Sequence, residues 1–280
     1  MMRRAARLAA AIAVSLAIVS PVTAVETDQA PLINDDYVCT HPSYNIHLLS
    51  KSPLVIYISD FITPSERKHL LELAAPTFSR SAVLDHSSGG SSQNTHRTSQ
   101  STSVSRLDPV VRCVQARALL FQGLNPSSPS VRALLEPLQL VKYGPGEHFH
   151  YHTDWFTDPS GTGGATARAG NRRSSFFGYV SVGNDTTGGG TNFPLLDAPE
   201  EGGVGFSWCS FVDCDAPYED GVTFRPIEGN AVYWENLNAD GSGDERALHA
   251  GLPVTTGSKV GMNIWTRQGP LPDELLGESA

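Results

Sequence analysis

Hydrophobic and polar positions follow helical spacing in parts of the first half of the chain. The segment 63–76 has the start signals of a helix, because Thr63 can cap it, Pro64 suits its first turn and Glu66 completes a capping box. A second helix is expected from Asp108 onward, where a proline again follows the capping residue, until a break rich in glycine, proline and serine. We therefore expect a helical portion before residue 138.

From residue 138 onward, the pattern changes to short apolar segments separated by turns rich in glycine and proline. The expected strands are 138–143, 174–182, 222–227, 231–236 and 259–267, with an earlier one at 54–58. Short strands with such turns are typical of a β-sandwich or jelly roll. We expect one mainly β domain with flanking helices, in which a jelly-roll core is preceded by the helical portion.

The N-terminal segment has the pattern of a secretory signal peptide. Three arginines precede the apolar run 8–19, and small residues at 22–24 follow Pro21. We expect cleavage after residue 24, and an uncleaved signal anchor is the alternative, although the run is short for a membrane span. No other segment of the sequence approaches that length. The polar stretch 25–53 is expected to form a loosely packed arm.

The charge balance is acidic. The chain has 20 basic and 29 acidic residues and a net charge of −9. Loss of the segment 1–24, which holds three arginines and no acidic residue, would leave 17 basic residues against 29 acidic ones, a net charge of −12. This balance argues against nucleic acids and anionic membrane surfaces as partners.

Four cysteines lie outside the expected signal peptide: Cys39, Cys113, Cys209 and Cys214. An even number in a secreted chain suggests disulfides. Cys209 and Cys214 are close enough in the sequence to close a small loop, so we favour this pair together with Cys39–Cys113. A zinc site is the alternative, although the sequence has no Cys-x-x-Cys. Asn184 begins a glycosylation sequon in a glycine-rich loop.

The segment 149–156, FHYHTDWF, places His150, His152 and Asp154 two residues apart from one another. Side chains two apart in an extended segment point to the same face. Two histidines and one carboxylate are the ligands of a mononuclear iron oxygenase, which leaves the opposite face of the metal open. The third ligand must come from a distant strand, and His249, the last histidine, is the candidate. His150 could replace His152 as a ligand. The alternative to a metal site is that His152 and Asp154 form a solvent-exposed, hydrogen-bonded pair.

The segment 259–267, KVGMNIWTR, has two different faces. Val260, Met262 and Ile264 form an apolar face, and the opposite face carries Lys259, Asn263, Trp265 and Arg267. The tryptophan favours the wall of a polar cavity over a solvated surface. A buried lysine needs an anionic partner, which a carboxylate of 2-oxoglutarate would provide. Tyr143, at the end of an expected strand, could donate its hydroxyl to the same carboxylate.

An ordered series of motifs resembles the catalytic domain of the prolyl 4-hydroxylase family. The motifs are LQLVKYGPGEHFHYHTDWF at 138–156, RRSSFFGYVSV at 172–182, GGGTNFP at 188–194, FRPIEGNAVYWENL at 224–237, HAGLPV at 249–254 and GSKVGMNIW at 257–265. The resemblance covers about residues 54–267. It implies an Fe(II)- and 2-oxoglutarate-dependent dioxygenase with a double-stranded β-helix core, which is a jelly roll.

The resemblance also implies roles for individual residues. The implied iron ligands, which are also the catalytic residues, are His152, Asp154 and His249, and the implied 2-oxoglutarate partners are Tyr143 and Lys259. The implied substrate residues are Arg97 and Ser99 of a loop motif, together with Glu136, Phe149, Arg172 or Arg173, Trp265 and Arg267 of a peptide groove. The family commonly has tyrosine at the position of Phe149 and often histidine at that of Arg267. Both departures concern the substrate side, so they affect the peptide preference and not the iron chemistry.

The implied function is 4-hydroxylation of prolyl residues in a proline-containing peptide or protein. Dioxygen and 2-oxoglutarate would be consumed, succinate and carbon dioxide released, and ascorbate would rescue oxidised iron. The domain would span 54–268 and be followed by a tail at 269–280. The signal peptide and disulfides predict the secretory pathway, either the endoplasmic reticulum lumen or secretion, without stable membrane insertion unless the anchor is retained. The alternatives are the same chemistry on a small molecule, a non-catalytic peptide-binding module and a zinc hydrolase.

Overall fold

The computed structural model describes residues 37–81, 97–157, 168–197, 199, 207–217 and 220–276, all within the unit Leu32–Ala280. The expected signal peptide lies outside the described residues. None of the described helices is long and apolar enough to cross a membrane.

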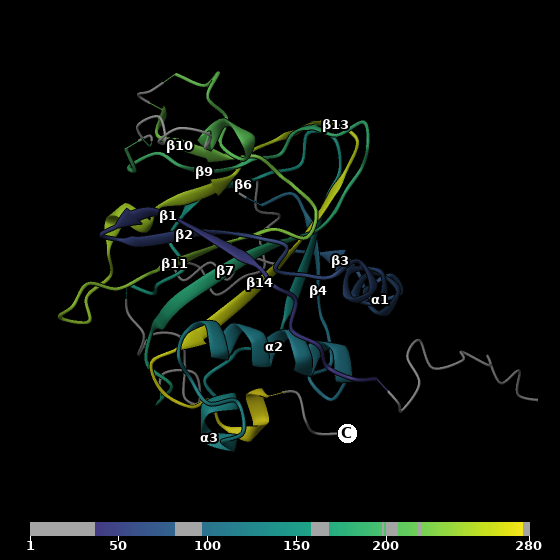
Figure 1. Ribbon diagram of the computed structural model, residues 1–280, viewed down its shortest axis with the longest axis vertical. Coiled ribbons are helices and arrows are strands. Elements are labelled where there is room, and N and C mark those ends of the chain that lie inside the picture. The colour runs from purple at the N-terminus through teal and green to yellow at the C-terminus, as the bar shows by residue number, and fades with distance from the viewer. Residues whose placement is uncertain are drawn as a thin grey trace, which may run out of the picture. The chain divides into compact units, whose positions relative to one another are not determined.

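Fourteen strands and three α-helices are described (Figure 1). The helices are α1 Pro64–Ala74, α2 Pro109–Phe121 and α3 Pro129–Arg132, and 3-10 turns lie at Trp208–Ser210, Glu245–Ala247 and Asp273–Leu275. The strands are β1 Asn45–Lys51, β2 Leu54–Ser59, β3 Ser79–Arg80, β4 Gln100–Ser103, β5 Gln139–Tyr143, β6 Phe149–His152, β7 Arg172–Val182, β8 Thr187–Gly188, β9 Thr191–Phe193, β10 Val222–Phe224, β11 Ala231–Glu235, β12 His249–Gly251, β13 Val254–Thr256 and β14 Lys259–Arg267.

Two sheets form the core, and the strand pairs within them are antiparallel. The major sheet has the order β1-β2-β11-β7-β14-β5-β4-β3, and the minor sheet has the order β10-β9-β12-β6. Strands β13 and β8 form a separate two-stranded ribbon. This architecture confirms the expected mainly β jelly roll with flanking helices.

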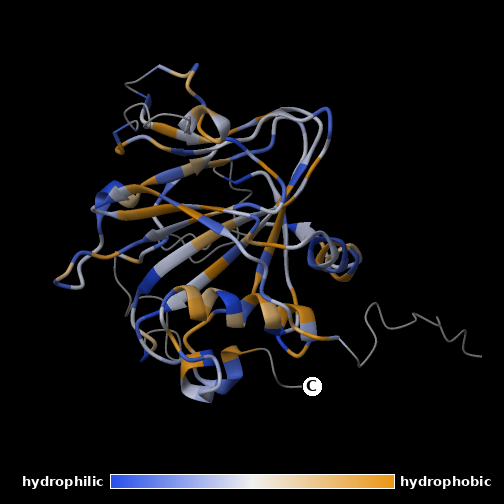
Figure 2. Cartoon of the chain, viewed as in Figure 1, coloured by the Kyte–Doolittle hydropathy of each residue, from blue (hydrophilic) through white to orange (hydrophobic). Residues whose placement is uncertain are grey.

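The major sheet is covered on both faces because its strands alternate apolar residues between two cores. Phe176 and Ile264 point toward α1 and α2, where they join one core with residues such as Val114. Phe177, the next residue along β7, joins Trp234 and the minor-sheet strands in the second core. Figure 1 shows α2 and strands β9 and β10 on opposite sides of β7 and β14. Apolar colouring runs along the central strands and interrupts the polar colouring of α2 (Figure 2).

Both expected helices begin where the sequence predicts. The Thr63 hydroxyl accepts a hydrogen bond from Glu66 N and the Glu66 carboxylate accepts one from Thr63 N, so the capping box of α1 is complete. The Asp108 carboxylate accepts hydrogen bonds from Val110 N and Val111 N at the start of α2. Glu66 also forms a buried ion pair with Arg117 of α2, at 2.6 Å between Oε1 and Nη2. Glu66, the third residue of the capping box in α1, thus joins the two helices.

The expectation of a loosely packed arm before residue 54 is wrong for its described part. Residues Asn45–Lys51 form β1, which pairs with β2 along the edge of the major sheet. Two apolar side chains of β1, Ile46 and Leu48, are exposed, so the sequence segment lacks the clean alternation that would have predicted a strand. Pairing with β2, and not burial of one face, accounts for this strand.

The structure contains both favoured disulfides. Cys39 is bonded to Cys113 at the start of α2, and Cys209 is bonded to Cys214 across a short turn. The first bond ties the segment before β1 to the helical layer. The expected strand at 222–227 ends earlier, at Phe224, because Pro226 has no N–H to donate to a neighbouring strand. Asn184 lies exposed in the turn after β7.

Candidate iron and 2-oxoglutarate site

The two sequence-distant histidines are brought together by strand register. His249 of β12 pairs directly with His152 of β6 in the minor sheet, and the ring centroids of the two imidazoles are 4.3 Å apart. Asp154 follows β6 by two residues. One ligand atom from each of the three side chains lies within 4.8 Å of the other two, which makes the set a candidate metal site.

Backbone contacts orient both imidazoles in the same way. His152 Nδ1 lies 2.7 Å from the carbonyl oxygen of His150, and His249 Nδ1 lies 2.9 Å from that of Ala247. A carbonyl oxygen can only accept, so each Nδ1 carries the proton and each Nε2 presents its lone pair to the metal position. Burial and the neighbouring His249 lower the pKa of His152 well below its ordinary value, so its imidazole is neutral. Two imidazoles oriented in this way suit a divalent metal.

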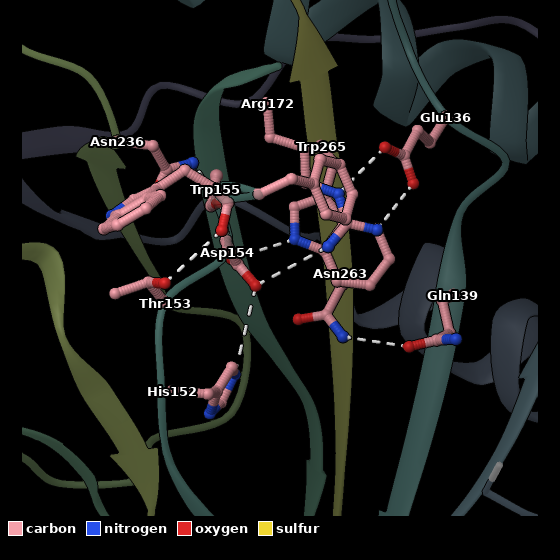
Figure 3. Close-up of polar contacts among 12 residues, drawn as sticks. Glu136, Gln139, His152, Thr153, Asp154, Trp155, Arg172, Asn236, Asn263 and Trp265 are labelled. Carbon is pink, nitrogen blue, oxygen red and sulfur yellow. Dashed lines mark hydrogen bonds and ion pairs between the residues drawn. The ribbon is translucent and has the colours of Figure 1, made fainter. Parts of the chain in front are cut away.

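The Asp154 carboxylate is held by side chains of the major sheet (Figure 3). Its Oδ2 accepts hydrogen bonds from Ser175 Oγ at 2.6 Å and from Trp265 Nε1 at 2.9 Å. Its Oδ1 lies 3.8 Å from Arg172 Nη1. Burial alone would raise the pKa of Asp154, but electrostatic interactions of its carboxylate with His249 and Arg172 outweigh burial and lower this pKa to about 2. Asp154 is therefore an anion throughout the neutral pH range.

These donors fit Fe(II). Two imidazole nitrogens and one carboxylate are the protein ligands of non-haem iron oxygenases, and the arrangement leaves coordination positions for other ligands. His150 itself is not in the set, because its side chain is exposed and only its carbonyl takes part. His148, whose Nδ1 lies 3.2 Å from the carbonyl oxygen of Gly146, also lies outside the set.

A buried lysine lies on the wall of the site that β14 forms with its neighbours β5 and β7. Lys259, the first residue of β14, is 1% exposed and pairs across the strands with Tyr143 of β5. Its ammonium lies 4.7 Å from the centroid of the Tyr143 ring and donates a hydrogen bond to the carbonyl of Gly189. Burial lowers the pKa of Lys259 to about 7, and no charged partner in the described part of the chain opposes that effect. A buried cation of this kind favours an anionic ligand.

Two glycines allow the wall to pack. Gly189 has a positive φ of 69°, which glycine adopts without strain. Its carbonyl accepts the hydrogen bond from Lys259. Gly261 lies between Lys259 and Asn263 on β14, where an added Cβ would be 2.2 Å from the Phe177 ring. Any side chain at Gly261 would therefore displace Phe177, whose ring also lies 5.6 Å from the lysine ammonium.

Three of the substrate residues implied by the resemblance, Arg172, Trp265 and Arg267, lie near Asp154, toward the end of β14 and the start of β7. Arg172 donates two hydrogen bonds to the Glu136 carboxylate, at 2.8 and 2.7 Å, and its guanidinium stacks 3.7 Å from the Trp265 ring centroid. Arg267 Nη1 lies 3.4 Å from the same carboxylate. Arg173 is exposed on the other face of β7, so Arg172 is the one of the two adjacent arginines that lies at the site.

Arg97 reaches the site from the segment before β4. Its backbone pairs with Phe149, and its guanidinium lies 4.7 Å from the centroid of the Phe149 ring. That ring stacks on His152 at a centroid distance of 3.6 Å. Arg97 donates hydrogen bonds to Ser99 Oγ and to Gln139 Oε1. Arg97 therefore reaches the metal site through Phe149, and Ser99 is held to Arg97 by a hydrogen bond.

Three residues of this wall were not recognised in the sequence: Ser175, Asn236 and Gln139. Asn236 donates to Ser175 Oγ, which in turn donates to Asp154. Asn263 and Arg97 both donate to Gln139 Oε1. The strand register identifies two of them, because Ser175 pairs with Trp265 and Gln139 pairs with Asn263. The sequence alone does not show this register, because it does not show which strands are neighbours.

The comparisons with known proteins agree with this geometry. Residues 138–267 match the model of the 2OG-Fe(II) oxygenase superfamily. Prolyl 4-hydroxylase 2 from Arabidopsis thaliana is 30% identical over 235 residues, covering 84% of this chain and 73% of the relative. Prolyl 4-hydroxylase 1 from the same organism is 28% identical over 224 residues, covering 79% and 71%.

The fold has a solved counterpart in the viral collagen prolyl hydroxylase of Paramecium bursaria Chlorella virus-1. The TM-score is 0.52 at 18% sequence identity, and the match covers 82% of this chain and 99% of the viral one. Fold and site thus define a 2-oxoglutarate- and Fe(II)-dependent dioxygenase, a class that uses dioxygen as co-substrate. Within that class, the chain belongs to the prolyl 4-hydroxylase family, which confirms the resemblance seen in the sequence.

Proposed function

We propose that this chain hydroxylates prolyl residues of a peptide or protein at the 4-position. In this proposal His152, Asp154 and His249 hold Fe(II), and Lys259 and Tyr143 hold the distal carboxylate of 2-oxoglutarate. The observation that carries it is the convergence of the three ligand atoms within 4.8 Å on a wall that also holds a buried lysine. A zinc hydrolase would use a similar triad but would leave the lysine without a purpose.

The overall reaction balances without further reagents. The C–H bond of the substrate, 2-oxoglutarate and dioxygen give the C–OH product, succinate and carbon dioxide, and ascorbate restores iron oxidised in unproductive turnovers. When bound, the iron would activate dioxygen, the oxidant, for cleavage of an unactivated C–H bond. The protein orients the ligands, because the backbone carbonyls of His150 and Ala247 keep both Nε2 atoms available.

Lys259 has a binding task in this reaction. Its ammonium would pair with the distal carboxylate of 2-oxoglutarate, and the Tyr143 hydroxyl would donate to the same group. Burial, opposed in part by Arg97, raises the pKa of Tyr143 to about 12, so the phenol keeps its proton and remains a donor. Both residues lie on the first register positions of the β14–β5 pair, which places the two donors side by side.

The peptide would lie against Phe149, Trp265 and the arginines. The relatives named prolyl 4-hydroxylases support a prolyl substrate. Trp265 and Phe149 would supply apolar walls for a pyrrolidine ring, and proline-rich chains lose little entropy on binding because they are preformed. We propose the secretory pathway as the location, because the two disulfides suit an oxidising compartment and the sequence predicts a signal peptide.

Mass spectrometry of proline-containing peptides tests this function. The peptides are incubated with enzyme, Fe(II), 2-oxoglutarate and ascorbate, and succinate is measured in the same samples. We expect a mass gain of one oxygen on proline, with succinate formed in equal amount. A small molecule hydroxylated in place of every peptide would contradict the substrate, whereas absence of succinate under all conditions would contradict the chemistry. N-terminal sequencing of the protein produced by secreting cells tests the predicted cleavage after residue 24.

A further inference from the structure

An asparagine on the polar face of β14 has an oxygen atom to which no described residue donates a hydrogen bond. Asn263 shares this face with Trp265, because the two side chains are two residues apart on one strand. Asn263 Nδ2 donates a hydrogen bond of 3.2 Å to Gln139 Oε1. Asn263 Oδ1 accepts none from the described part of the chain, and it retains exposed surface, unlike the enclosed side-chain atoms that lack a partner. This oxygen is therefore an accessible acceptor.

Arg97 fixes the orientation of the Asn263 amide through Gln139. A guanidinium has only donors, so the Gln139 atom that lies 3.1 Å from Arg97 Nη2 must be the amide oxygen. The Asn263 amide faces the same oxygen and must therefore present its NH2 group to it. The Asn263 oxygen then lies on the other side of the amide, and Figure 3 shows it directed to the side on which His152 and Asp154 lie.

Strand geometry places this acceptor near the metal position. Trp265 donates through Nε1 to Asp154 Oδ2 at 2.9 Å, and Asn263 lies two residues before Trp265, which is about 7 Å along a strand. Successive residues of an extended peptide advance by about 3.3 Å. A peptide with a prolyl ring at the metal would thus bring one of its neighbouring backbone groups to Asn263.

Among the molecules that the proposed reaction brings to the site, the peptide is the one that can donate to this oxygen. At neutral pH 2-oxoglutarate has two carboxylates and a keto group, which are all acceptors, and dioxygen has no hydrogen. The target prolyl residue has no N–H either. The backbone donor that remains close to the metal is the N–H of a residue next to that proline.

We propose that Asn263 Oδ1 accepts a hydrogen bond from the backbone N–H of a residue directly next to the prolyl residue that is hydroxylated. This inference rests on the proposed function and narrows its substrate to prolyl residues with a non-prolyl neighbour at that position, because a second proline would have no N–H to offer. Gln139 and Arg97 are positioning residues, since they hold Asn263 in the orientation that presents its oxygen.

A series of peptides that differ in one backbone group tests this hydrogen bond. In the parent peptide, alanine lies on both sides of a single target proline. Lactic acid replaces either alanine in turn, so that an ester oxygen takes the place of one N–H without added bulk, and proline replaces either alanine in two further peptides. KM and kcat are measured for each peptide with the wild-type enzyme. We expect the ester at one of the two positions to raise KM roughly five- to 100-fold, and proline at that position to raise it at least as much.

Variants assign this effect to Asn263. Asn263→Leu has a similar shape but no acceptor, and we expect it to reduce the ratio of ester to parent KM to roughly threefold or less. An effect of the ester on the peptide alone would persist in this variant. Asn45→Leu, on the exposed edge strand β1, makes the same exchange away from the site and keeps the wild-type ratio.

Gln139→Leu is the second test, because it removes the partner that orients Asn263 and leaves the acceptor in place. We expect a partial reduction of the same ratio. Near-ultraviolet circular dichroism shows whether each variant is folded. If Asn263→Leu does not fold, the ratio in Gln139→Leu decides.

The outcomes separate this inference from the proposed function. Equal KM values for the parent and both ester peptides would overturn the inference while prolyl hydroxylation stood. An ester effect of unchanged size in the folded variants would also overturn it. If succinate formed but no peptide gained oxygen, the proposed function itself would fail, and this inference with it.

Discussion

The minor and major sheets supply two chemically different halves of the site. In the minor sheet, His152 and His249 are each oriented by a carbonyl two residues earlier in the chain. In the major sheet, Lys259, Trp265 and Arg172 gain their positions from partners on neighbouring strands. Local contacts orient the imidazoles of the first half, whereas contacts between distant segments position the side chains of the second. Changes in the first half should therefore abolish function, whereas changes in the second should alter it by degrees.

The largest expected effect is that of His249→Ala. Loss of one of three protein ligands should abolish turnover and strongly weaken Fe(II) binding, measured by equilibrium titration of the metal. His41→Ala removes an exposed histidine outside the site and is the matched control. A variant that retained both iron and activity would show that His249 is not a ligand.

Lys259→Ala should produce the next largest effect, and on a different ligand. Loss of the charged partner of a buried carboxylate typically costs on the order of 2–5 kcal/mol, which is roughly 30- to 5,000-fold in 2-oxoglutarate affinity. Iron binding should change little. Lys142→Ala is the control, because Lys142 lies on the neighbouring strand β5 with its side chain exposed. The assignment fails if the two variants require the same concentration of 2-oxoglutarate.

Ser175→Ala should weaken iron binding to an intermediate degree. The variant removes one of the two hydrogen bonds to Asp154 Oδ2 and leaves the three ligands in place. Loss of such an outer partner typically costs about 10- to 100-fold in metal affinity. Ser174→Ala is a close control, because the Ser174 hydroxyl donates to Gln122 on the other side of the sheet. Equal iron affinities of the two variants would mean that Ser175 does not position Asp154.

The smallest expected effect is a pH dependence of 2-oxoglutarate binding. Burial lowers the pKa of Lys259 to about 7, so the free enzyme loses this charge as the pH rises above that value. A bound carboxylate favours the protonated lysine and raises its pKa again. Affinity should therefore fall by up to about tenfold per pH unit above 7, with uptake of a proton on binding. Calorimetry in two buffers of different ionisation enthalpy measures that uptake, and Lys259→Ala should abolish it.

The same contrast between local and distant contacts explains how far the sequence predicts the structure. Helix starts at Thr63 and Asp108 follow from capping chemistry within a few residues, and both were predicted correctly. The polar and apolar faces of β14 follow from alternation alone. Strand β1 was missed because its pairing with β2, and not a pattern of its own, holds it in the sheet.

The arginine side chains near Asp154 show how much of the site the sequence alone does not predict. The resemblance implied Glu136 and Arg172 as separate substrate residues. Their bidentate ion pair depends on which segments are neighbours in the folded chain. Ser175 is one serine of two in a row, and only the register with Trp265 shows which one faces Asp154. Side-chain pairing across a sheet is set by tertiary structure, so residue types at given spacings do not predict it.

An anaerobic titration of 2-oxoglutarate into the Fe(II)-loaded protein tests most directly whether the groups of the two sheets form one binding site. Chelation of iron by the keto acid gives a visible charge-transfer absorption, which reports that both ligands occupy one site. We predict that this absorption appears in the wild type, is absent from His249→Ala, and requires a much higher concentration of 2-oxoglutarate in Lys259→Ala. Absorption that developed identically in all three proteins would contradict the account, because neither sheet would then supply the groups assigned to it.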